Sequence, residues 1–133
     1  MKEIMKIAML RDNRAQALVE MAFVLTILLL LLAGIIEFGR VFSAQLIVLH
    51  ASREGARLGA IDPDDSAIRA RAKDAAGALD TTNVTVTISA ESRERGEQLT
   101  VQVEYDVAII MPFIGSILPN PYTVRGVTKM RIE

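Results

Sequence analysis

The sequence predicts an α+β protein in which a long N-terminal helix precedes a small antiparallel sheet. Three observations support this class: an apolar run near the N-terminus, a proline-free helical pattern that continues after it, and a later switch to alternation with a period of two. We expect a long helix over residues 17–60, with a membrane half and an exposed half, then a second amphipathic helix and a three-stranded antiparallel sheet.

The apolar run is about long enough to cross a bilayer. Residues 21–36 contain no charge, and adding residues 17–19 gives roughly 20 residues, or about 30 Å of helix. Basic residues outnumber acidic ones before the run, so we expect the short N-terminus to stay in the cytoplasm and the rest to be exported. A cleaved secretory signal is the alternative, but the run is longer than a usual signal core and lacks a clear small-x-small cleavage site.

One carboxylate, Glu20, lies just inside the cytoplasmic end of this run. A charge at the centre of a bilayer costs about 2.5–3.5 kcal/mol on insertion scales, and less near an interface. A simple anchor has no use for that cost, whereas a subunit that matches a positive charge on its neighbour does. The other interpretation is that Glu20 only reaches the head-group region.

Small residues recur along the exposed half of the helix, where Ala51, Gly55 and Gly59 are spaced by four. This spacing predicts a smooth face on which another backbone can pack, and Gly34 is expected to act in the same way inside the membrane. A frayed helix end is the alternative for Gly59. Glu37 and Arg40 lie one turn apart and are expected on a solvated flank.

The second helix is expected to begin at an Asp62 cap with Pro63 in its first position, and to end near residue 78. Alternating apolar residues then predict strands over residues 84–89, 99–109 and 122–132, with a charged hairpin loop over residues 91–97. The apolar face of such a sheet needs a cover, which the two amphipathic helices can provide.

An apolar segment, residues 110–119, stands where polar turn residues would be expected. Two interpretations of it are equally good. It contacts a membrane surface or another chain, or it folds back over the sheet edge as part of the core.

Composition limits the chemistry of the chain. The formal net charge is −1, which gives no electrostatic signature of nucleic-acid binding. There is no cysteine, and the one histidine, His50, has no partner for a metal site, so neither a metal nor a cofactor is expected. No nucleophilic elbow or paired-acid arrangement is apparent, and we therefore expect no enzymatic activity.

Several motifs together resemble the TadE-like family of pseudopilins, in the tight-adherence (Flp) branch of type IV pilus systems. They are Arg-Ala-Gln-Ala-Leu-Val-Glu-Met-Ala-Phe at residues 14–23, Gly-Ile-Ile-Glu-Phe-Gly-Arg at residues 34–40 and Ala-Ser-Arg-Glu-Gly-Ala-Arg at residues 51–57. The closing residues 128–133 also resemble the last strand of the family. The resemblance therefore touches both ends of the chain.

The resemblance implies that a prepilin peptidase cuts between Ala15 and Gln16, with Ala15 in place of the usual glycine and Glu20 as the fifth residue of the product. It implies a cytoplasmic leader over residues 1–15, a hydrophobic helix over residues 16–61 and an exported head over residues 62–133. The expected partners are the peptidase, membrane lipid before assembly, and other pilin or pseudopilin subunits in a homo- or hetero-polymer.

The implied location is the bacterial inner membrane, with a single pass, and an extracellular pilus after assembly. Two functions remain: a structural subunit drawn from the membrane into a filament, or a permanently anchored scaffold or binding protein of the assembly machinery. The N-terminus distinguishes them, because a filament subunit must lose its basic leader before its helix can leave the membrane.

Overall fold

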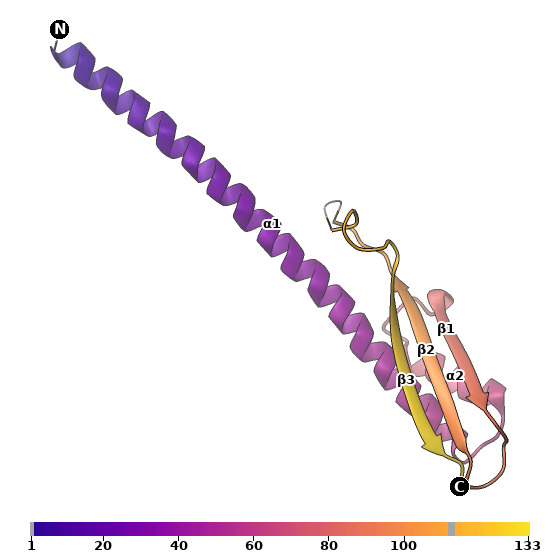
Figure 1. Cartoon of the computed structure of the whole chain (residues 1–133). Helices are drawn as coiled ribbons and strands as arrows, with labels where there is room; N and C mark the ends of the chain where they lie inside the picture. Colours follow the sequence, from indigo (N-terminus) through magenta and orange to yellow (C-terminus); the bar gives the residue numbers. More distant parts are fainter. Residues whose placement is uncertain (1, 112–113) are drawn as a thin grey trace. The chain divides into compact units, whose positions relative to one another are not determined.

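The computed structural model describes residues 2–111 and 114–133 (Figure 1). The side chains described here begin at residue 13. The elements in chain order are helix α1 (Lys2–Gly59), helix α2 (Asp65–Ala75), the short 3-10 turn η1 (Thr81–Asn83), and strands β1 (Val84–Ala90), β2 (Gln98–Val107) and β3 (Tyr122–Arg131). This composition confirms the predicted α+β class.

The chain divides into two compact units, an N-terminal unit (Met1–Ile36) and a head unit (Glu37–Glu133). The N-terminal unit is part of α1. The head unit contains the rest of α1 together with α2 and the sheet. This compact unit includes part of the long helix, whereas the exported head over residues 62–133 stays a prediction.

The sheet is antiparallel throughout, in the order β1-β2-β3. Because successive side chains on a strand point to opposite faces, the alternating sequence places its leucine and most of its valines on one face of the sheet. The buried large side chains of this face are Val84, Val86, Leu99, Val101, Val103, Val107 and Val124. Ile68 and Ala72 of α2 belong to the same core cluster.

The head-unit part of α1 reaches the sheet through its smallest side chains. Ala44, Val48 and Ala51 are buried on this face of the helix. At Gly126 of β3 the two backbones meet, since a Cβ added there would lie 2.5 Å from the Val48 carbonyl oxygen and 2.7 Å from the Leu49 nitrogen. No side chain larger than hydrogen fits at Gly126. The sequence pattern did not predict this contact.

Helix α2 begins later than predicted. Its cap is Asp64, whose carboxylate accepts a hydrogen bond from the Ser66 N–H at 2.9 Å. Asp62, the predicted cap, instead accepts from the Asp64 N–H at 3.0 Å and shapes the turn before the helix. Hydrogen bonds from the side chain and backbone of Ser66 hold the pKa of Asp64 below its ordinary value. The helix ends at Ala75, earlier than predicted.

Strand β2 also ends before the predicted residue 109, and the amide of Asn120 explains why. This side chain accepts from the Ile109 N–H at 3.1 Å and donates to the Ile109 carbonyl at 3.2 Å. The backbone groups of Ile109 are thereby bonded to a side chain rather than to a neighbouring strand, and the ladder stops at Val107.

A second amide protects the outer edge of the sheet. Gln45 of α1 donates to the Arg125 carbonyl at 2.8 Å and accepts from the Arg125 N–H at 3.3 Å. The pair of bonds imitates one step of a strand ladder. An edge strand with free N–H and C=O groups invites pairing with other chains, and Gln45 closes the middle of β3 to such pairing.

The contact at Gly126 makes a direct prediction. Gly126→Ala should destabilise the head by about 1–3 kcal/mol, because the added methyl group meets backbone atoms that cannot rotate away. Gly39→Ala is the matched control, since an added Cβ there meets nothing within 4 Å and should raise helix stability by up to about 1 kcal/mol. Thermal unfolding of the two full-length variants in detergent, followed by circular dichroism, gives the comparison. Equal melting temperatures would contradict this view of the interface.

Candidate assembly site on helix α1

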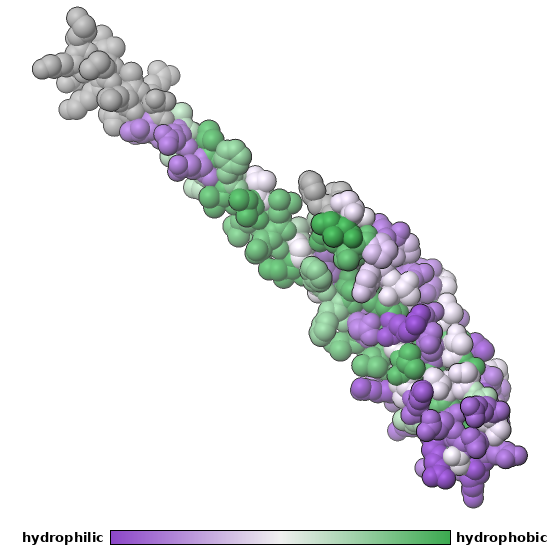
Figure 2. Space-filling view, in the orientation of Figure 1, coloured by the Kyte–Doolittle hydropathy of each residue, from purple (hydrophilic) through white to green (hydrophobic). Residues whose placement is uncertain are grey.

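The N-terminal unit presents a long apolar surface. Its large hydrophobic side chains between Leu18 and Ile36 are all exposed, from 46% at Leu32 to 71% at Leu18. Figure 2 shows them as a hydrophobic stretch of the helix that follows a short hydrophilic one. Within the described part of the chain, Asn13–Gly59 is the one helical stretch long and apolar enough to cross a membrane. A surface of this kind requires lipid or another chain to cover it.

The predicted cleavage residues and Glu20 lie on this helix. Ala15, Gln16 and Glu20 are all exposed and helical. Gln16 and Glu20 are four residues apart, and therefore neighbours on one face of the helix. Among residues 13–111 and 114–133, no ion pair involves Glu20. Because Ala15 and Gln16 are helical, a protease that cuts between them would need the helix to open locally.

The four predicted packing residues fall in two environments. Gly34 belongs to the N-terminal unit, where an added Cβ would meet nothing within 4 Å. Ala51, Gly55 and Gly59 belong to the head unit, and Ala51 is completely buried. A Cβ on Gly55 would lie 3.1 Å from the Ala72 Cβ, and one on Gly59 would lie 2.1 Å from Leu99. The spaced small residues therefore bring α1 against α2 and β2 of the same chain.

The prediction for Glu37 is wrong. This residue was expected on a solvated flank, but it is only 3% exposed. One carboxylate oxygen accepts from Arg40 at 2.8 Å, and the other accepts from the Ile110 N–H at 3.3 Å. Burial is tolerated because both oxygens have donors, one of them charged.

A signal for this burial was present in the sequence. Residues 37, 41, 44 and 48 recur at intervals of three and four, so Glu37 lies on the same helical face as the buried Ala44 and Val48.

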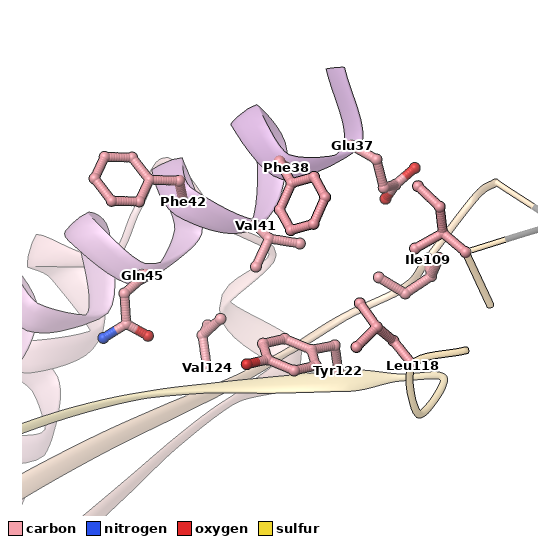
Figure 3. A pocket seen from close by; sticks show the side chains of 10 residues that line it. Glu37, Phe38, Val41, Phe42, Gln45, Ile109, Leu118, Tyr122 and Val124 are labelled. Atoms are coloured by element: carbon pink, nitrogen blue, oxygen red, sulfur yellow. The ribbon is translucent and has the colours of Figure 1, made fainter. Parts of the chain in front are cut away.

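Beside Glu37 an apolar groove of about 340 Å³ runs between α1 and the segment that joins β2 to β3 (Figure 3). Its lining is Glu37, Phe38, Val41, Phe42, Gln45, Ile109, Ile114, Leu118, Tyr122 and Val124. The apolar segment over residues 110–119 had two interpretations, contact with a membrane or another chain, or folding back as part of the core. Its described residues are all exposed or half-buried, with Ile110 and Ile117 exposed, so they are not part of the buried core. Residues 112 and 113 lie outside the described part.

The described residues offer no candidate metal centre. No group of three His, Cys, Asp or Glu side chains between residues 13–111 and 114–133 is placed to hold a metal ion. His50 is exposed on α1.

The sequence model of the TadE-like protein family matches residues 15–57, about a third of the chain. This match covers the exposed apolar stretch, Glu20, Glu37 and the first two head-unit packing residues, and it confirms the resemblance for that segment. No curated protein and no solved structure gives a significant match.

The two glycine environments predict different outcomes for one substitution. Gly55→Leu should destabilise the head by about 1–3 kcal/mol, because the side chain enters space held by Ala72 and Val101. Gly34→Leu should leave the melting temperature unchanged or slightly higher, since the site is open and leucine favours helix. Circular dichroism of both variants in detergent measures the difference. If Gly55→Leu had the same melting temperature as the wild type, the spacing of the small residues would be accidental.

Proposed function

We propose that this TadE-like chain is a pilin-like subunit of a tight-adherence pilus, trimmed by a prepilin peptidase and assembled through its apolar helix. The family match and the apolar helix fit a single-pass, membrane-anchored protein associated with Tad pili. One observation carries the finer proposal. A single helix, α1, has an uncovered apolar surface over residues 18–36 and a face buried in the head over residues 37–59.

The buried core of the head unit is formed by residues of the head unit alone. The residues of its buried core cluster all lie between Ala44 and Val124, and the residues packed around it begin at Val41. The apolar surface of the N-terminal unit is therefore free to exchange lipid for the helices of other subunits while the head stays folded. A filament subunit has to undergo this exchange.

Trimming would add a charge at the place where Glu20 can use it. Cutting after Ala15 creates an α-ammonium on Gln16, whose unperturbed pKa is near 8. Glu20 is one helical turn away and can pair with this group or with that of an adjoining subunit. An unpaired carboxylate in an apolar bundle costs several kcal/mol, so a register that pairs the charges is favoured over slipped registers.

A permanently anchored scaffold protein is the second candidate, and Ala15 is the observation that favours it. The family pattern has glycine before the cut, and a poorly cut leader would keep the helix in the membrane.

Mass spectrometry of the protein from its native membrane and from shed filaments tests the choice. We expect a first residue at Gln16, and we expect Ala15→Leu to accumulate uncut in the membrane, because a pocket shaped for a small residue excludes leucine. Ala15→Gly is the matched control and should be trimmed at least as well as the wild type. An intact Met1 in the native protein would support the scaffold instead.

Glu20→Gln tests the charge-pairing mechanism. The variant keeps the shape and helix propensity, so insertion and trimming should be normal, while recovery in sheared filaments should fall, most of all when it is mixed with wild-type subunits. Thr26→Val is the control, because Thr26 bonds to the Ala22 carbonyl of its own helix at 2.8 Å and carries no charge. If Glu20→Gln gave the same filament yield as the wild type, the charge-pairing mechanism would be wrong, and packing of the leucines alone would set the register.

A further inference from the structure

The segment between β2 and β3 has apolar side chains that lie outside the buried core of the head. No charged residue lies between Asp106 and Arg125. We refer to its described residues 108–111 and 114–118 as the isoleucine loop. Ile117 is 83% exposed and Ile110 is 66% exposed, and Phe38 of α1, which lines the neighbouring groove, is 65% exposed.

The isoleucine loop is tied to one particular turn of α1. The Ile110 N–H donates to Glu37 at 3.3 Å, and the guanidinium of Arg40 reaches the Ala108 carbonyl at 3.5 Å as well as Glu37. Glu37 is also the first charged residue after the uncharged residues 21–36. In a helix that crosses a bilayer, the first charged turn beyond the apolar span lies at the lipid–water interface.

Several backbone groups of the isoleucine loop are hydrogen-bonded, within the loop or to Asn120. The Ile114 and Gly115 N–H groups donate to the Met111 carbonyl at 3.1 and 3.0 Å, and the Ile117 and Leu118 N–H groups donate to the Ile114 carbonyl at 3.0 and 2.9 Å. The Asn120 amide satisfies both backbone groups of Ile109. Each backbone group that is paired in this way costs less free energy to move from water towards lipid than a free one.

We propose that the isoleucine loop docks into the membrane surface where α1 leaves the bilayer, with Ile110 and Ile117 in the boundary between head groups and acyl chains. We choose lipid as the occupant because Glu37 binds the isoleucine loop to the turn of α1 at the end of the apolar span, which places the loop at the membrane surface. The contact would fix the head against the membrane before assembly and would have to be released with the helix. The proposal rests on the membrane anchoring of α1 in the proposed function.

Tryptophan fluorescence provides the test, because the chain contains no tryptophan. Single variants of the full-length protein are placed in vesicles of phosphatidylcholine and phosphatidylglycerol, with and without brominated acyl chains that quench tryptophan. Ile117→Trp and Ile110→Trp probe the loop, and Leu29→Trp probes the span. Ile61→Trp is the matched control: Ile61 is 71% exposed but follows the end of α1, about 33 Å of helix beyond Glu37.

We expect the two loop tryptophans to show blue-shifted emission and bromolipid quenching, with weaker quenching than Leu29→Trp, while Ile61→Trp is not quenched. Quenching of Leu29→Trp without quenching of either loop variant overturns this inference and leaves the anchoring intact. Loss of quenching at Leu29 itself overturns the anchoring. A blue shift that appears only at high protein density, without quenching by brominated lipid, would show that a second copy covers the loop. This result would also overturn the inference. Circular dichroism checks that each variant is folded.

Discussion

The head depends on one close contact, the meeting of the α1 and β3 backbones at Gly126. Because a Cβ there would lie 2.5 Å from the Val48 carbonyl, the helix approaches the sheet nearly as closely as two backbones can. The same approach requires small residues along the helix, and Ala51, Gly55 and Gly59 supply them where α1 meets α2 and β2. With so little side-chain volume between the layers, a substitution that separates them disturbs every contact along the helix.

Polar side chains of α1 also bond the helix to the sheet. Gln45 closes the β3 edge at Arg125, and Ser52 lies 2.8 Å from the Thr128 hydroxyl. Glu37 holds the backbone at Ile110, beyond the end of the ladder. Each of these groups finds a partner only because the helix is close, so the polar contacts depend on the small residues. They also explain why the part of the long helix from Glu37 to Gly59 belongs to the head.

This arrangement separates two tasks along one helix. The head-unit part of α1 is committed to the sheet, whereas the exposed apolar part in the N-terminal unit has no role in the core of the head. In the proposed function, the apolar segment would exchange lipid for other helices while the head stays folded. Glu20 would then give a register to packing that is otherwise non-directional, and the isoleucine loop would hold the head at the membrane until that exchange occurs.

The sequence by itself determined the class of the fold, the positions of the helices and strands to within a few residues, the apolar span and the family resemblance. These follow from local periodicity, which is written along the chain: a period near 3.6 over α1, a period of two in the strands, and an uncharged run of bilayer length. It also indicated the spacing of Ala51, Gly55 and Gly59, although not the surface that they meet. Tertiary structure decided the rest, because those features join residues far apart in sequence. Glu37 is buried through a backbone group 73 positions later, Gly126 matters only through α1, and Asn120 ends a strand on the other side of a loop. A helical pattern cannot show which of its charges will find a partner, because the partner lies on another element.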